Sequence, residues 1–309
     1  MRTYIAATDI GFGDAIICLP VISAIIDKCP NVYLVARSFR QSGIAERIKG
    51  IKGEIAESEL KLEEGDRYIN LRDHPLQLNY VWGSPEFESF FGPTKIEKIV
   101  EAIAKDFGFE VDYSHLPKLE HTIRKDLSNC IAFVPGTDLF HKHWPHSYWM
   151  SVYKELRKAE QEVIVLGRPA ESPAVQRLLN EGLKWIETPS IADSIDVISS
   201  CRAVLAIDTG LMHVAVTQGI PTFALLHPAY YHMRSANNCF NLTGSHCDPD
   251  CCRDLTPPAG FMAASNLQVK HKFNRRECTL PLAQNCMAKI KPEDVIELMK
   301  KQNVFSLSV

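Results

Sequence analysis

The sequence predicts an α/β protein of two domains, each built on a parallel β-sheet. At 309 residues, the chain is longer than one ordinary hydrophobic core supports, and it suits two domains of roughly 150 residues each. Short apolar runs alternate with longer runs in which apolar residues recur at helical spacing. This alternation is typical of strand–helix–strand units in a parallel sheet, and it occurs in two series along the chain.

The first series begins near the N-terminus. Residues 4–7 and 32–35 are short apolar runs that predict strands, and residues 15–26 between them predict a helix. A further strand-like run covers residues 68–71. The order strand, helix, strand predicts that the first two strands are parallel neighbours.

The second series begins after residue 128. It predicts strands at residues 131–134, 163–166, 203–207 and 222–226, with helices at about 173–180 and 193–200 between them. A helix after Pro145 would place Trp149, Val152, Tyr153 and Leu156 on one face. Pro292 begins a last helix, in which acidic residues of the first turn and lysines of the last turn match the helix dipole.

These elements predict three segments. The first domain covers residues 1–128, the second covers 129–290 with a cysteine-rich insertion at 239–286, and a helix occupies the C-terminal segment 291–309. Residues 115–129 have mixed charges and little periodicity, which is typical of a linker.

Composition excludes several classes of protein. Hydrophobic residues make up 46% and charged residues 23% of the chain, which are ordinary values for a globular protein. The net charge of -3 is spread without long runs of one sign, so nucleic acid is not an expected partner. No apolar run reaches the roughly 18 residues of a membrane-spanning helix, and the N-terminus leads directly into a strand. We therefore expect a cytoplasmic protein.

A glycine turn follows the first predicted strand. Gly11 and Gly13 would let a ligand approach the backbone amides where the next helix begins. A dinucleotide-binding fingerprint would need a third glycine at Ile16 and an acidic residue at Arg37. A nicotinamide-dependent enzyme is therefore disfavoured.

Asp14 completes this turn. Its carboxylate, at a helix N-terminus, is placed to accept a proton from a hydroxyl nucleophile. It could equally cap the helix and stabilise the helix dipole. The residues alone leave both roles open.

Two polar motifs follow strands of the second series. Gly136, Thr137 and Lys142 supply a turn, a hydroxyl and a cation, which together can bind a phosphate. The alternative is an ordinary turn with a solvated Lys142 and a core Trp144.

The second motif, Asp208-Thr209-Gly210, lies where a strand turns into a helix, and the free amides of such a turn bind anions. Alternatively, Asp208 and Thr209 merely cap the helix and His213 is a buried histidine without a ligand.

With these motifs in this order, the chain resembles glycosyltransferase family 9, the ADP-heptose:lipopolysaccharide heptosyltransferases. Three blocks carry the resemblance: GFGDAIICLPVISAI at residues 11–25, PGT with KHWP at 135–145, and DTGLMHVAVTQGIPTFAL at 208–225. The resemblance is strong over residues 131–228 and weak over 38–125. It implies a GT-B architecture, in which two Rossmann-like domains with parallel sheets face a central cleft, and it implies transfer with inversion at the sugar.

The resemblance also implies roles for single residues. Asp14 corresponds to the family's base, which deprotonates the acceptor hydroxyl. Thr137 and Lys142 correspond to residues that contact the donor phosphates. The amides of Thr209 and Gly210 do likewise.

Further donor-binding candidates surround these residues. Asp208 and His213 are neighbours of the phosphate-binding amides, and the glycine turns at Gly13 and Gly136 are assigned to donor binding. Glu171 falls where the family contacts the nucleoside, so it could accept hydrogen bonds from ribose hydroxyls. A solvated loop carboxylate fits Glu171 equally well.

The ten cysteines fall into two groups. Cys18, Cys29, Cys130 and Cys201 lie in or beside apolar stretches and are expected to be small core residues. The other six lie between residues 239 and 286.

Four cysteines of the second group, Cys247, Cys251, Cys278 and Cys286, are candidate ligands of a structural zinc or iron. Relatives of this family that modify autotransporter proteins carry a four-cysteine iron site in a similar place. The spacing from Cys278 to Cys286 is not that of a standard zinc knuckle. Free thiols are the second interpretation, after a metal site. Disulfides are the third, because the expected compartment is reducing.

The resemblance implies transfer of a sugar, by family likeness a heptose from ADP-heptose, to a hydroxyl of a cell-surface glycan such as the lipopolysaccharide core. Expected partners are the nucleotide-sugar and a glycan or lipid-linked glycan acceptor, with peripheral contact to the inner membrane and no cofactor for catalysis. The alternatives are an autotransporter-type protein heptosyltransferase and a non-catalytic nucleotide-binding GT-B module. Arg72, His74 and Tyr80 are candidate acceptor contacts and are equally consistent with plain surface residues.

Overall fold

The computed structural model contains two compact units, and among the residues it describes the first unit covers the chain up to Glu120 and the second covers the chain from His121 onward. It describes residues 1–7, 12–36, 43–71, 96–111, 117–137, 142–227, 236–245 and 284–305. The domain division predicted after residue 128 lies slightly later, between the 3-10 turn Lys125–Leu127 and the first strand of the second unit.

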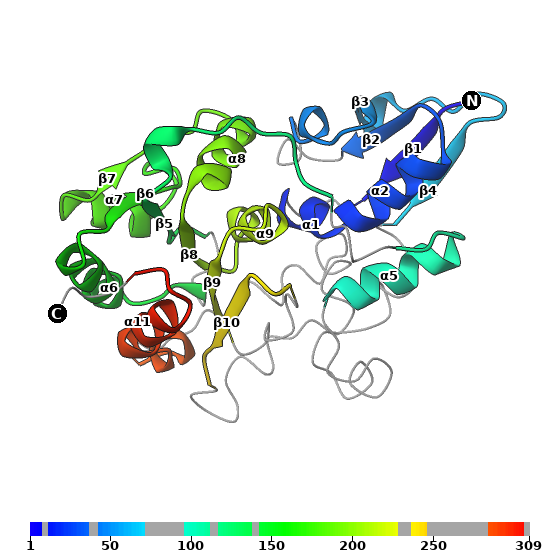
Figure 1. The fold of residues 1–309 in the computed structure, drawn as a ribbon. Coiled ribbons are helices and arrows are strands. Elements are labelled where there is room, and N and C mark those ends of the chain that lie inside the picture. Colours follow the sequence, from blue (N-terminus) through cyan, green and yellow to red (C-terminus); the bar gives the residue numbers. More distant parts are fainter. Residues whose placement is uncertain are drawn as a thin grey trace. The chain divides into compact units, whose positions relative to one another are not determined.

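The first unit is built on a parallel four-stranded sheet in the order β3-β2-β1-β4 (Figure 1). Its strands are β1 (Thr3–Ala6), β2 (Val32–Ala36), β3 (Ile51–Ala56) and β4 (Arg67–Asn70). Ile5 lies opposite Leu34 on one side and Ile69 on the other, and all three are buried. The strands predicted near residues 4, 32 and 68 are therefore confirmed, whereas β3 was not predicted because its polar, half-exposed sequence IKGEIA lacks an apolar run.

Helices α1 (Phe12–Ile17), α2 (Leu19–Lys28) and α5 (Ile96–Asp106) accompany this sheet. The single helix predicted over residues 15–26 is wrong in one respect, because the chain breaks it at Cys18 into α1 and α2. Pro20 explains the break: it has no backbone N–H to continue a helix but fits the first turn of a new one.

The second unit is built on a parallel six-stranded sheet in the order β10-β9-β8-β5-β6-β7 (Figure 1). Its strands are β5 (Cys130–Val134), β6 (Glu162–Val165), β7 (Lys184–Trp185), β8 (Ala203–Ile207), β9 (Thr222–Leu226) and β10 (Cys239–Thr243). From β5 the chain moves outward to β6 and β7, then returns to the other side of β5 for β8, β9 and β10. This reversal creates a switch point between β5 and β8, and ligands of such sheets bind at the carboxyl ends of the strands there.

The helices of the second unit match the predicted ones closely. They are α6 (His146–Lys158), α7 (Pro173–Asn180), α8 (Ile191–Ser200), α9 (Gly210–Thr217) and α11 (Pro292–Lys301), with a 3-10 turn at Cys286–Lys289. The predicted apolar face of α6 is confirmed, since Trp149, Val152 and Leu156 are buried and Tyr153 packs against the same core. A capping box between Ser190 and Asp193 fixes the start of α8.

Strand β10 corrects the predicted extent of the irregular insertion. The insertion was expected to begin at Cys239, but residues 239–243 pair in parallel with β9 and extend the sheet. Phe240 packs on Phe223 with ring centroids 5.1 Å apart. The nearby cysteines and prolines obscured a five-residue strand whose apolar content is low.

No helix in the described part of the chain is long and apolar enough to cross a membrane.

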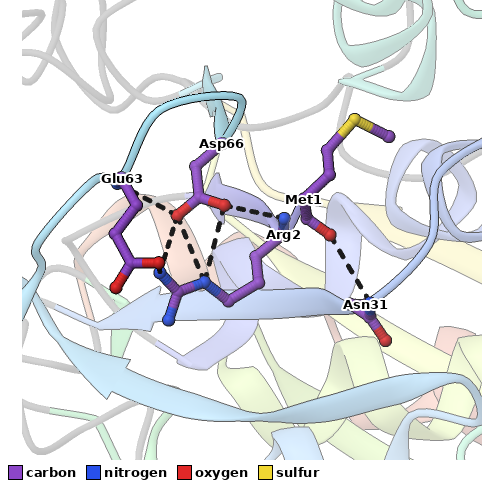
Figure 2. Close-up of polar contacts among 5 residues, drawn as sticks. All are labelled: Met1, Arg2, Asn31, Glu63 and Asp66. Carbon is purple, nitrogen blue, oxygen red and sulfur yellow. Dashed lines mark hydrogen bonds and ion pairs between the residues drawn. The ribbon is translucent and has the colours of Figure 1, made fainter.

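An ion pair ties the N-terminus of the first unit to the turn before β4 (Figure 2). Asp66, whose side chain is 3% exposed, accepts hydrogen bonds from the Arg2 backbone N–H at 2.8 Å and from its guanidinium at 2.9 and 3.1 Å. These side-chain hydrogen bonds outweigh burial and lower the pKa of Asp66 to about 2. Glu63, 77% exposed, lies 2.8 Å from the same guanidinium.

The Asp66→Asn variant is expected to melt at a lower temperature than the wild type at pH 7. Because the folded-state pKa lies below its ordinary value of 3.8, the stabilisation is complete above about pH 4 and is lost as pH falls toward about 2. Thermal unfolding across this range should show the difference between variant and wild type shrinking with acid. Glu63→Gln is the matched control and should change little, because an exposed ion pair contributes little. An equal difference at pH 7 and at pH 2 would contradict the role of the Asp66 charge.

Candidate functional site

The structure brings the two polar motifs of the second unit to neighbouring strands. Strands β5 and β8 pair in parallel, with Val134 opposite Ala206. Gly136 and Thr137 follow β5, and Asp208 follows β8, so both motifs leave the same carboxyl edge at the switch point. This is the position at which such a sheet binds its ligand.

A buried ion pair joins the two motifs. Lys142 Nζ donates to Asp208 Oδ2 at 2.5 Å, and the two side chains are only 8% and 4% exposed. Lys142 is therefore not the solvated lysine of the alternative interpretation. Trp144 is indeed a core residue, and its indole N–H donates to the Ile290 carbonyl at 2.9 Å.

His213 contacts the other oxygen of the same carboxylate. Its Nε2 lies 3.4 Å from Asp208 Oδ1, and the imidazole is buried. Burial alone would raise the pKa of Asp208, but the Lys142 charge and the hydrogen bonds and charge of His213 outweigh burial and hold it well below its usual range. Asp208 is therefore ionised, and its charge is neutralised by its neighbours, so it does not repel an anion beside it.

The N-terminus of α9 lies directly after Asp208. Thr209 occupies the N-cap position with extended backbone (φ -147°, ψ 166°), but its side chain makes no capping hydrogen bond. Its Oγ1 is buried, and no group in the described ranges forms a hydrogen bond with it. A threonine at this position ordinarily accepts from a first-turn amide, so the helix presents a hydroxyl and uncapped amides together. Capping by Thr209 is thus not what the structure shows.

Two glycines bring the loops after β5 and β6 against the first turn of α7. A Cβ on Gly136 would lie 3.0 Å from Ser172 Oγ, and one on Gly167 would lie 2.8 Å from Val175 Cγ2. Gly167 also has a φ of +123°, which disfavours other residues. A side chain at Gly136 would therefore crowd Ser172, so packing within the protein favours a glycine there, in addition to any approach by a ligand.

Other predicted donor-site residues lie further along the edge or in the first unit. Glu171 is exposed and pairs with Arg168 at 3.0 Å, so its carboxylate is accessible from solvent. Gly13 and Asp14 lie in α1 of the first unit, and the side chain of Asp14 is outside the described part of the structure. The candidate acceptor residues Arg72, His74 and Tyr80 also fall outside the described residues.

The cysteine group is described only at Cys286, which is buried in the core of the second unit. Cys247, Cys251 and Cys278 lie outside the described residues. Within the described ranges, no group of three or more His, Cys, Asp or Glu side chains could hold a metal ion. The four cysteines expected to be small core residues are all described. Three of them are buried as predicted, namely Cys18, Cys130 and Cys201, and Cys29 is half-buried.

His227 is a buried polar residue at this edge that the sequence motifs did not include. It follows β9, the strand beside β8, where Ile207 lies opposite Leu225. A histidine directly after the apolar run TFALL is the same kind of pattern as Asp208 after β8 and could have been found in the same way.

The fold of two parallel-sheet units is that of the GT-B class, as predicted. A solved structure of E. coli heptosyltransferase WaaC with ADP-2-deoxy-2-fluoro heptose superposes with a TM-score of 0.63, covering 98% of this chain and 100% of that chain at 15% identity. The iron-containing dodecameric glycosyltransferase TibC from enterotoxigenic E. coli gives 0.64, covering 97% of this chain and 75% of that chain at 14% identity. At such identities the likeness establishes the fold alone.

Sequence comparison finds relatives over part of the chain. The model of glycosyltransferase family 9 (heptosyltransferase) matches residues 90–232, which include the Lys142 and Asp208 motifs. Lipopolysaccharide heptosyltransferase 1 of Pseudomonas aeruginosa is 32% identical over 101 residues, which are 32% of this chain and 28% of that protein. These matches confirm the resemblance to glycosyltransferase family 9 over the matched part of the chain. The aligned segment spans less than a third of that curated relative.

The Lys142→Met variant is expected to be destabilised by about 3 to 5 kcal/mol, because it leaves the Asp208 carboxylate buried without its main partner. The double variant Lys142→Met/Asp208→Asn removes both charges and should recover much of that loss. Urea unfolding of the wild type, both single variants and the double variant measures the coupling. Single-variant losses that simply add would show that the two side chains are not coupled.

Proposed function

We propose that this protein is an inverting glycosyltransferase that moves a sugar from a nucleoside diphosphate sugar to a hydroxyl of a cell-surface glycan such as the lipopolysaccharide core. Its relatives are lipopolysaccharide heptosyltransferases, and WaaC has been solved with ADP and with an ADP-heptose analogue. ADP-heptose is therefore the proposed donor. The observation that carries the proposal is the buried Lys142–Asp208–His213 group beside the uncapped start of α9.

The main chemical demand on this site is the leaving group. When the bond between the anomeric carbon and the β-phosphate oxygen breaks, the departing nucleoside diphosphate gains negative charge. A preorganised cation and uncapped amides at a helix N-terminus stabilise that charge without rearrangement. Lys142 supplies the cation, and the first turn of α9 after Thr209 supplies the amides.

Asp208 is a positioning residue in this mechanism. It holds Lys142 and His213 at fixed places on either side of one carboxylate. Because its own charge is neutralised by these contacts, the site accepts a phosphate despite the buried carboxylate. The Thr209 hydroxyl gains a partner when a phosphate oxygen binds beside it.

The remaining predicted residues complete the donor site and the proton transfer. Thr137, which follows β5, is proposed to contact the phosphates, and Glu171 is proposed to bind the ribose. Asp14 is proposed to remove the proton of the acceptor hydroxyl as that oxygen attacks the anomeric carbon. Attack opposite to the leaving diphosphate inverts the configuration in one step.

We propose a glycan or lipid-linked glycan acceptor reached by peripheral contact at the cytoplasmic face of the inner membrane. Catalysis by the residues above uses no cofactor. The cysteine group of the insertion is proposed to bind a structural zinc or iron, and metal analysis of the purified protein tests this.

The Asp14→Ala variant is expected to lose transfer activity by a factor on the order of 100 to 10,000, which is the usual contribution of a general base. Its affinity for ADP should stay unchanged, because the donor diphosphate binds in the second unit. Transfer from ADP-heptose and calorimetric ADP binding measure the two effects. The matched control is Asp27→Ala, an exposed aspartate at the end of α2.

Unchanged turnover of Asp14→Ala would remove that residue from the mechanism. A wild-type protein that binds ADP but neither transfers nor hydrolyses the donor would instead be a non-catalytic binding module. Transfer to an autotransporter protein but not to a lipopolysaccharide core would identify the protein-modifying alternative.

A further inference from the structure

We propose that the indole of Trp185 is the stacking surface for the base of the donor nucleotide. The inference rests on the proposed function and extends the same donor site by one residue. It comes from the position of Trp185 at the sheet edge, its exposure and its hydrogen bond.

Trp185 ends β7, the outermost strand on the β6 side of the sheet (Figure 1). Its backbone lies opposite Val165 in β6, and its indole N–H donates to the Gly167 carbonyl at 3.0 Å. The residue is 37% exposed. Among the large hydrophobic side chains that are exposed in the described ranges, it is the aromatic one. The other described tryptophans, Trp144 and Trp149, are 3% and 2% exposed.

The hydrogen bond orients this indole without burying it. A tryptophan N–H usually finds an acceptor, and here the acceptor belongs to the loop that follows β6. The bond fixes the polar edge of the ring system at the carboxyl edge of the sheet. A ligand that stacks on the ring therefore meets a surface that has already lost much of its conformational freedom.

A continuous path of strand ends leads from the phosphate site to Trp185. The carboxyl ends of β8, β5, β6 and β7 are consecutive neighbours in the sheet. Neighbouring strands are about 4.8 Å apart, so the end of β7 lies roughly 10 Å from the end of β5, which is about the reach of a nucleoside from its phosphate.

A glycine lies shortly after the end of each of two strands on this path, β5 and β6. Gly136 and Gly167 pack directly against Ser172 and Val175 at the start of α7, and neither glycine carries a side chain above the sheet edge. A nucleoside lying across these loops would place its ribose near the exposed Glu171. Its base would then lie at Trp185.

Stacking on an exposed aromatic ring strengthens the binding of a nucleotide. An aromatic side chain contributes about 1 to 3 kcal/mol to the binding of a stacked base. The competing explanation is that Trp185 only covers the edge strand β7 and has no ligand.

The test compares ADP and inorganic pyrophosphate as ligands in calorimetry. Trp185→Ala is expected to weaken ADP binding by about 5-fold to 150-fold, the equivalent of losing one stacked base. Pyrophosphate affinity should stay unchanged, because pyrophosphate lacks the base. Trp185→Phe keeps an aromatic face and should retain most of the ADP affinity. Lys184→Ala, in the same strand and also exposed, is the matched control and should bind ADP as the wild type does.

Each outcome decides the inference. An ADP affinity of Trp185→Ala within about 2-fold of the wild type overturns it and leaves the proposed function standing. Equal losses of ADP and pyrophosphate affinity, together with a lower melting temperature, also overturn it, because they show a structural role. A wild type that binds neither ADP nor pyrophosphate overturns both the inference and the proposed donor site.

Discussion

The buried pair of Lys142 and Asp208 is the interaction on which the candidate site depends. It places a cation at the carboxyl edge of the sheet, where two neighbouring strands end and the start of α9 has no side-chain cap from Thr209. A buried pair of this kind contributes little net stability but is costly to break. Its value here is positional, because the lysine is held in one place before any phosphate arrives.

The sheet topology explains why these residues meet. Lys142 and Asp208 are 66 positions apart in sequence, yet they follow adjacent strands because the chain returns to the other side of β5 after building β6 and β7. The same topology carries the carboxyl edge outward to β7 and Trp185. Phosphate site and proposed base site are therefore two parts of one edge.

Much of the fold was predictable from sequence, because buried parallel strands are short apolar runs and α6 and α11 have clear periodicity or end charges. The failures have physical causes. Pro20 split a helix whose apolar spacing is continuous, and β10 was missed because its sequence CFNLT lacks a typical apolar run. At the site, the polar motifs were identified because they directly follow predicted strands. The ion pair between Lys142 and Asp208 was not predicted. Pairing across the sheet depends on strand order, which local patterns do not contain.

The most direct measurement is a crystal structure of the protein with ADP bound. The account predicts that oxygens of the diphosphate lie within hydrogen-bond distance, about 2.7 to 2.9 Å, of Lys142 Nζ, and that they contact the backbone amides at the start of α9. Asp208 should keep its contact with Lys142 in that complex. A diphosphate bound elsewhere, or one that leaves Lys142 bonded only to Asp208, would contradict the role of Lys142 as the phosphate-binding cation.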